Sequence, residues 1–344
     1  MDTEKEAYLY QKLDGGAVRC DTCGHACVIP PGKLGFCKTR ENRGGTLYSL
    51  EYGLISSVNV NPVEKKPLFH FYPGSSLLTI GSWSCTFVCP WCQNDGISKT
   101  GPQGKASQSY TMTPQTLLDI TLENGCAGTS MSFSEPTTFL EYAVDVFKLT
   151  RDAGLYNTVV TNGYFTPAAA DLMLESGADA FNIDIKGDAE TYAQYCSGDI
   201  EKVWQNVKKL RDSGAHIELT TLVIPDVNDS DACLNGIAAR IVQEAGPETP
   251  WHISRYHPAY RFHNPPTPVR TLEQAYDIGK ENGLLYIYAG NIPGHRYENT
   301  CCPSCGEELI RRVGFEVQRN RLGEDRRCPE CGQEIPIVGR WERI

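Results

Sequence analysis

The chain has 344 residues, of which 40% are hydrophobic and 22% are charged, and its net charge is −10. This length predicts a main domain with smaller attachments, and the acidic balance disfavours nonspecific binding to nucleic-acid phosphates. The first residues, MDTEKEAYLYQ, are charged, and no window approaches 18 consecutive apolar residues. We therefore expect a cytoplasmic protein that does not insert into a membrane.

The first 75 residues hold the first of three cysteine groups. This group is Cys20, Cys23, Cys27 and Cys37. Because cytosolic thiols stay reduced, clustered cysteines are expected to be metal ligands before disulfides. A zinc site is the first interpretation and an auxiliary iron–sulfur cluster the second, so residues 1–75 are predicted to form a small Cys-rich domain. Lys65, Lys66 and His70 follow, and they form either a solvated turn or a face toward a substrate.

Short apolar runs alternate with helical patterns between residues 76 and 294. The predicted strands are residues 76–81, 128–134, 157–163, 179–187, 216–224 and 251–257. Several helical segments between them begin at Ser, Thr or Asp and end at Gly, the residues that favour helix caps. Six strands alternating with five helices predict an α/β fold with a parallel sheet, open or rolled into a partial (β/α)6 barrel of the TIM type. A seventh unit, with TLEQAYDIGKENG as its helix and LLYIYAG as its strand, can extend the sheet.

Polar residues cluster at the ends of the predicted strands. They are Ser134, Glu135, Asn162, Asp184, Lys186, Arg255 and His257. Taken singly, each is most simply a turn or a helix cap. Ligands of parallel sheets gather at the carboxyl ends of the strands, however, so the set together predicts one shared pocket.

The second cysteine group follows the first predicted strand, in GSWSCTFVCPWCQNDG. A structural tetrahedral metal site needs four protein ligands. The three thiols of Cys85, Cys89 and Cys92 can instead hold three irons of a [4Fe–4S] cluster and leave the fourth iron open. A zinc site that borrows a distant ligand is the structural alternative. The pattern C-x3-C-x-aromatic-C, with Trp91 at the aromatic position, resembles that of the radical S-adenosylmethionine (SAM) enzymes.

That resemblance implies a chemistry and two cofactors, the [4Fe–4S] cluster and SAM. One electron from the cluster would cleave SAM to methionine and a 5′-deoxyadenosyl radical, which abstracts hydrogen from a substrate. Trp91 would lie next to the adenine. Ser134 and Glu135, in FSEPT, would lie near the SAM amino group, although no Gly-Gly precedes this glutamate as it does in the family.

Further motifs are similar to those of the pyruvate formate-lyase activating enzymes. VTNGY and DIK correspond to the third- and fourth-strand motifs of that family. The resemblance implies that Asn162, Asp184 and Lys186 surround the ribose and the methionyl carboxylate. His257, in RYHP, resembles the histidine of the sixth strand.

Two segments of the first 75 residues resemble one particular group of radical SAM enzymes. CDTCGHACVIPPGKLGFCKTR followed by NPVEKKPLFHFYPGS resembles the radical SAM members of the AmmeMemoRadiSam system. It implies action on a small molecule or a modified side chain, with an electron donor such as flavodoxin or ferredoxin and with partner proteins of that system. An activase of a glycyl radical enzyme is the second hypothesis. A non-enzymatic metal-stabilised scaffold or nucleic-acid adaptor is the third.

The last cysteine group lies in residues 295–344. Two CxxCG motifs contribute Cys302, Cys305, Cys328 and Cys331. Their spacing predicts a zinc ribbon or a rubredoxin-like iron site with a structural role, while Cys301 is a bystander. Eight arginines balance eight acidic residues from 301 onward, which does not support nucleic-acid binding. Cys126, Cys196 and Cys233 stand alone and are expected to be small buried residues.

Overall fold

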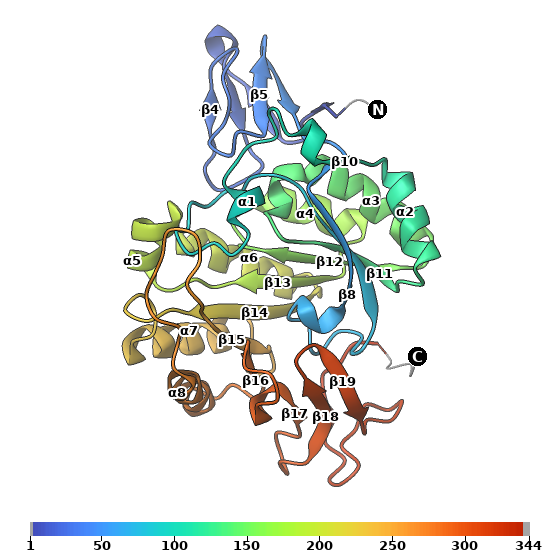
Figure 1. Ribbon diagram of the computed structural model, residues 1–344, viewed down its shortest axis with the longest axis vertical. Helices are drawn as coiled ribbons and strands as arrows, with labels where there is room; N and C mark the ends of the chain where they lie inside the picture. Colours follow the sequence, from blue (N-terminus) through green and yellow to red (C-terminus); the bar gives the residue numbers. More distant parts are fainter. Residues whose placement is uncertain (1–2, 340–344) are drawn as a thin grey trace.

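The computed structural model describes residues 3–339 and places an eight-stranded sheet at the centre of the molecule, between two small β modules (Figure 1). The strands lie in the order β16-β15-β14-β13-β12-β11-β9-β8. Their bounds are β8 (Ser57–Pro62), β9 (Ser76–Gly81), β11 (Gly128–Met131), β12 (Tyr156–Thr161), β13 (Ala180–Asp184), β14 (His216–Val223), β15 (Trp251–Arg255) and β16 (Ile287–Gly290). From β9 to β16 all pairings are parallel, which confirms the six predicted strands and adds the seventh.

Strand β8 was not predicted, although it belongs to the same sheet. It pairs antiparallel with β9, from Ser57 opposite Gly81 to Pro62 opposite Ser76. A segment of the first 75 residues is therefore a strand of the central sheet. It forms the edge of the sheet opposite β16.

Helices connect the parallel strands. The longer ones are α2 (Pro114–Glu123), α3 (Leu140–Asp152), α4 (Pro167–Ser176), α6 (Ile200–Asp212), α7 (Asp231–Glu244) and α8 (Val269–Glu281). The short ones are η1 (Asp14–Gly16), η2 (Val63–Lys65), α1 (Asp95–Ser98), η3 (Ala106–Gln108), η4 (Pro136–Phe139), α5 (Ala189–Thr191), η5 (Tyr192–Cys196) and η6 (Arg296–Glu298). The expected cap chemistry is present, since the Thr113, Thr166 and Ser230 side chains accept hydrogen bonds from the first turns of α2, α4 and α7.

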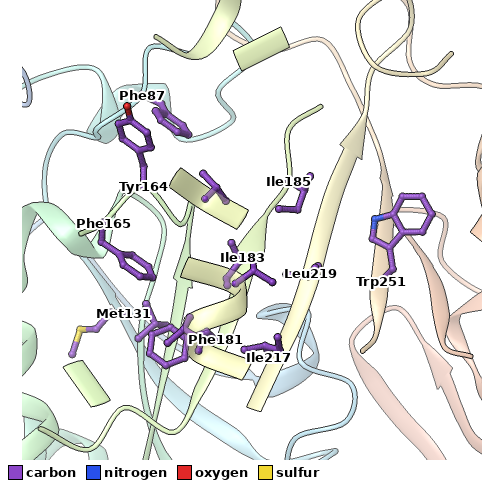
Figure 2. Close-up of a cluster of buried hydrophobic side chains, with 14 of the residues drawn as sticks. Phe87, Met131, Tyr164, Phe165, Phe181, Ile183, Ile185, Ile217, Leu219 and Trp251 are labelled. Atoms are coloured by element: carbon purple, nitrogen blue, oxygen red, sulfur yellow. The ribbon is translucent and has the colours of Figure 1, made fainter. Parts of the chain in front are cut away.

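The two faces of the parallel strands differ in polarity. Phe181, Ile183 and Leu219 point into an apolar core shared with the helices, and all three are fully buried (Figure 2). Successive side chains of a strand point to opposite faces. Their alternates, including Asn182 and Thr220, therefore face the interior of the partial barrel, where the Thr220 hydroxyl donates to Asn182 Oδ1 at 2.9 Å. The interior is thus polar, as a ligand site requires.

The N-terminal module consists of small sheets at one end of the molecule (Figure 1). One is formed by β1 (Lys5–Glu6), β5 (Arg40–Arg43) and β6 (Thr46–Ser49), the second by β2 (Tyr10–Lys12), β3 (Val18–Cys20) and β4 (Val28–Ile29), and β7 (Leu54–Ile55) pairs with β10 (Tyr110–Thr111). A buried ion pair joins the module to α3, where Arg40 Nη1 lies 2.6 Å from Glu141 Oε1. Removing one partner would leave an uncompensated buried charge, so this pair fixes the module to the barrel.

A three-stranded ribbon lies at the opposite end (Figure 1). It is built from β17 (Thr300–Cys301), β18 (Glu308–Val313) and β19 (Glu316–Asn320). Leu309, Ile310 and Ile337 of the ribbon pack with Phe69 and Tyr288 of the barrel. Within residues 3–339, no helix combines the length and the apolar character that crossing a membrane demands.

Candidate active site

One cavity of about 430 Å³ opens at the carboxyl ends of the parallel strands, the edge where ligands of such sheets bind. It brings together most of the residues singled out from the sequence. Those that line it are Cys85, Cys89, Trp91, Cys92, Ser134, Glu135, Asn162, Asp184 and Lys186. The shared pocket expected from the strand ends is therefore present.

The loop after β9 supplies the three thiols. Glu51 anchors its start, accepting from Ser82 Oγ at 2.8 Å and from Trp83 N at 3.1 Å. The Phe87 amide donates to Cys85 Sγ at 3.3 Å. Burial raises the pKa of the Cys85 thiol to about 12, so this thiol requires a positive partner, such as iron, to become a thiolate.

Cys89 has a neighbour that the sequence did not reveal. Cys196, expected only as a small buried residue, is fully buried and lies with its Sγ 3.5 Å from Cys89 Sγ. It does not line the cavity, where the thiols are those of Cys85, Cys89 and Cys92. Three thiols on one wall, facing open space, fit a cluster with one open iron better than a closed four-ligand site.

Glu135 is engaged with its own chain. It receives hydrogen bonds from Thr137 N and Oγ1, from Thr161 Oγ1 and from Asn162 N, at 2.6–3.2 Å. Burial raises the pKa of its carboxyl group, and these donors oppose the shift. Glu135 therefore ties the ends of β11 and β12 together. In contrast, the buried hydroxyl of Ser134 has no hydrogen-bond partner among residues 3–339, as expected of a group that awaits a ligand.

Asn162 links the strand ends to the cysteine loop. Its Nδ2 donates to Thr86 Oγ1 at 2.9 Å and lies 3.5 Å from Cys85 Sγ, while its Oδ1 accepts from Tyr164 N. The side chain thus orients the loop that carries the thiols. Asn162 also lines the cavity, and the ribose contact that the resemblance implied stays a prediction.

Asp184 and Lys186 form an ion pair at the end of β13, with Nζ 3.0 Å from Oδ2. Burial opposes the charge of Lys186, but Asp184 and Cys89 outweigh it and raise the pKa of the amine well above its usual value. Both side chains keep part of their surface exposed to the cavity. They present one negative and one positive group side by side.

Lys66 also lines the cavity, whereas the sequence left open whether it belongs to a solvated turn or faces a substrate. Its amine is buried, donates to Asn61 Oδ1 at 3.1 Å and lies 4.6 Å from the ring centre of Phe133. Burial, helped by the neighbouring charge of Lys65, lowers the pKa of Lys66 to about 7. Phe315, from the tip of the β18–β19 hairpin, also lines the cavity.

A buried carboxylate, that of Glu218, holds the segment of Phe69 and His70 next to β14 and β15. Glu218 accepts from the amides of Phe69 and His70, at 3.0 and 2.7 Å, and lies 2.9 Å from His216 Nε2 and 2.6 Å from His252 Nε2. Burial alone would raise the pKa of Glu218, but the hydrogen bonds from the two histidines lower it far below its usual range. No motif pointed to it, because its partners come from distant segments.

His257 does not line the cavity. It is exposed and follows β15, beyond Arg255, whose Nε donates to Thr267 O. The alternation of β15 turns His252 and Ser254 inward instead, and both line the cavity. The histidine that faces the site is therefore one within the strand.

The C-terminal cysteines form a compact group. The Sγ atoms of Cys302, Cys305, Cys328 and Cys331 all lie within 4.8 Å of one another. Each CxxCG motif makes the same turn, in which the glycine amide donates back to the carbonyl of the first cysteine, Cys302 or Cys328, at 2.9 Å. This group can bind a metal ion, and Cys301 lies outside it.

Comparisons with known proteins agree with this geometry. The model of the radical SAM superfamily matches residues 82–233. Uncharacterized protein MJ0808 of Methanocaldococcus jannaschii is 40% identical over 97% of this chain and 99% of its own. A probable GTP 3′,8-cyclase of Halobacterium salinarum is 25% identical over 50% of this chain and 53% of its own.

Solved structures show the same fold. A radical SAM methyltransferase from Sphaerobacter thermophilus matches with a TM-score of 0.51 and 13% identity, covering 87% of this chain and 81% of that one. SuiB of Streptococcus suis, solved with S-adenosylmethionine, matches with a TM-score of 0.50 and 10% identity over 62% of this chain and 52% of that one. The fold and site define an α/β protein with a three-cysteine loop at the carboxyl edge of a partial barrel. The chain belongs to the radical SAM superfamily.

Proposed function

We propose that this protein cleaves SAM reductively and uses the resulting 5′-deoxyadenosyl radical to abstract hydrogen from a small molecule or a modified side chain. The observation that carries the proposal is that Cys85, Cys89 and Cys92 share one cavity with the Asp184–Lys186 pair. When bound, a [4Fe–4S] cluster supplies the electron that cleaves the sulfonium bond. An external donor, such as flavodoxin or ferredoxin, would supply that electron.

The polar wall matches the methionyl end of SAM, which carries an ammonium and a carboxylate. Asp184 can accept from the ammonium and Lys186 can donate to the carboxylate. The Ser134 hydroxyl, buried without a partner, can add one hydrogen bond to either group. Asn162 and Glu135 then act as positioning residues, because their hydrogen bonds hold the cysteine loop and the strand ends.

The lining of the cavity favours a small substrate over a protein backbone. Lys66, His252 and Phe315 of the β18–β19 hairpin all line it. A glycine in a partner protein would have to share the cavity with this hairpin. This supports the small-molecule reaction over the activase, and cooperation with partner proteins of the AmmeMemoRadiSam system belongs to the same proposal.

Anaerobic reconstitution tests the proposal. The reconstituted protein, given SAM and dithionite, should release 5′-deoxyadenosine and methionine, measured by mass spectrometry. A Cys85→Ala/Cys89→Ala/Cys92→Ala variant should release neither, while Cys126→Ala, which removes a buried thiol outside the cavity, should behave as wild type. SAM cleavage by the triple variant would refute the proposal. A candidate substrate is then identified by deuterium transfer from it into 5′-deoxyadenosine.

A further inference from the structure

The N-terminal module brings the segments that carry its four cysteines near one another. Cys20 N donates to Cys27 O at 2.9 Å, and Ala26 N donates to Cys23 O at 3.1 Å, so residues 20–27 fold back on themselves. The amide of Phe36, next to Cys37, donates to Cys27 Sγ at 3.5 Å and brings the fourth thiol to the same point. The apolar core of the module is small and includes Cys20 itself. A core of this size gains stability when a bound metal cross-links the chain.

Polar groups of the module surround the sulfur atoms. Cys37 Sγ lies 3.2 Å from Thr39 Oγ1, and Cys20 Sγ lies 3.5 Å from Thr22 Oγ1. Together with the Phe36 amide, these groups can donate to thiolates, as the hydrogen bonds around metal-bound cysteines do. Buried free thiols need no such donors.

The distance between the thiols distinguishes a single zinc ion from an iron–sulfur cluster. A single tetrahedral zinc, with Zn–S bonds of about 2.3 Å, holds its sulfurs about 3.8 Å apart. Among residues 3–339, the ribbon cysteines form the group compact enough for one ion. Neither the four N-terminal cysteines nor Cys85, Cys89 and Cys92 form such a compact group within the described part of the chain. A cluster of several irons spreads its thiolates more widely than one ion does, which favours the second of the two alternatives left open by the sequence.

We propose that Cys20, Cys23, Cys27 and Cys37 hold a second iron–sulfur cluster, and that the loaded module positions the loop of the catalytic cysteines. Ser84 Oγ donates to Cys37 O at 2.5 Å, immediately before Cys85. The ring of His25, within the same turn as Cys23 and Cys27, lies with Nε2 2.7 Å from Thr86 O. The two contacts flank Cys85 on both sides. The positioning part rests on the proposed function, while the second cluster does not.

The first experiment counts clusters without relying on activity. After anaerobic reconstitution with ⁵⁷Fe, the wild-type chain should hold about eight acid-labile sulfides and the Cys85→Ala/Cys89→Ala/Cys92→Ala variant about four. Adding Cys23→Ser to that variant should remove the remaining sulfide and its Mössbauer signal, whereas adding Cys126→Ser should not. Because the ribbon holds at most a single metal ion and no sulfide, the sulfide count does not include the ribbon. If the triple variant contains no sulfide, or if zinc is bound at the N-terminal cysteines, the proposal of a second cluster is wrong.

The second experiment tests positioning. The single variant Cys23→Ser keeps the catalytic cysteines and should keep about four sulfides. SAM changes the EPR spectrum of the reduced cluster, and in this variant the change should require at least about ten-fold more SAM. This factor corresponds to a loss of about 1.4 kcal/mol in the free energy of SAM binding. An unchanged SAM titration would overturn the positioning role and leave the second cluster standing. Complete loss of sulfide from this variant would overturn the assignment of a separate cluster to the catalytic cysteines, and the proposed function with it.

Discussion

Lys66 shows how one residue can shape both stability and chemistry. Its amine is buried beside Phe133, and Asn61 is the one hydrogen-bond partner of its Nζ among the described residues. Because burial lowers its pKa to about 7, the amine can lose its proton near neutral pH. A neutral amine facing the cavity can accept a proton from a substrate, and a protonated one can hold an anionic group.

Replacing Lys66 by methionine should stabilise the fold at pH 7. Between pH 7 and about 10.5 the unfolded chain binds more protons than the folded one, so the stability of the wild type rises with pH across this window. Lys66→Met should remove that rise and gain about 1–3 kcal/mol at pH 7, measured by urea unfolding. The matched control is Lys65→Met, at an exposed neighbour, which should change little. Equal behaviour of the two variants would contradict the burial argument.

The Asp184–Lys186 pair should serve SAM and not the fold. Lys186→Met should weaken SAM binding about 10- to 100-fold, because a charge-assisted hydrogen bond contributes about 1.5–3 kcal/mol. Calorimetric titration of the reconstituted protein measures this effect. Lys209→Met, which breaks a surface ion pair with Asp171, is the control and should leave SAM binding unchanged. Large losses of thermal stability in Lys186→Met would show that the pair is structural.

At the scale of elements, Glu218 joins the segment before β9 to β14 and β15. Its oxygens satisfy two backbone amides and lie within hydrogen-bond reach of two histidines. His70 extends the network, since its Nε2 lies 2.6 Å from the hydroxyl of Tyr288 in β16. The segment that contains Lys66, Phe69 and His70 is thus held by a polar network and not by apolar packing alone.

This network should make the fold sensitive to acid. Burial lowers the pKa of His70 to about 3, so the unfolded chain binds more protons between about pH 6.5 and pH 3, and stability falls as the pH falls through this window. The lowered pKa of Glu218 acts in the same direction below 4.5, the ordinary pKa of a glutamate. Glu218→Gln should cost about 3–5 kcal/mol at pH 7 and flatten the decline below pH 4.5. Urea midpoints from pH 7 to pH 4 check both effects, and an unchanged pH profile would refute them.

The local part of this architecture could be predicted from the sequence. Strand alternation and the Thr and Ser helix caps are short-range signals, and they identified six parallel strands and the cavity at their ends. Strand β8 was missed because edge pairing depends on its partner. Lys66 and Glu218 gained their roles from contacts with distant segments, which no motif encodes. His257 was singled out by its place at a strand end and by resemblance, but it is exposed, and β15 turns His252 toward the cavity instead.

At the scale of the whole molecule, the ribbon does more than end the chain. Arg312 is fully buried, donates to Phe69 O at 2.8 Å, and lies with Nε 3.6 Å from Glu64 Oε1. Phe315, three residues further, lines the cavity. A metal held by the ribbon cysteines would therefore stabilise a module that contributes one residue to the lining of the cavity.

Loss of the ribbon metal should leave SAM chemistry intact and loosen the ribbon. In a Cys302→Ser/Cys305→Ser variant, sulfide content and SAM cleavage without substrate should match the wild type, while limited proteolysis should cut within residues 296–339 at least about ten-fold faster, because local opening becomes cheaper by about 1.4 kcal/mol. Cys233→Ser, at a buried cysteine of α7, is the control. Loss of SAM cleavage with the barrel sulfide retained would make the ribbon a working part of the site.

The contact between Arg312 and Phe69 spans 243 residues of sequence, and this separation has a consequence during synthesis. A ribosome adding about 5–20 residues per second needs roughly 12–50 s to make the intervening chain. Until then the cavity lacks Phe315, one of the residues that line it. Cys85, Cys89 and Cys92 are made within this interval, so we expect iron and sulfide to be able to reach these thiols before Phe315 joins the cavity lining.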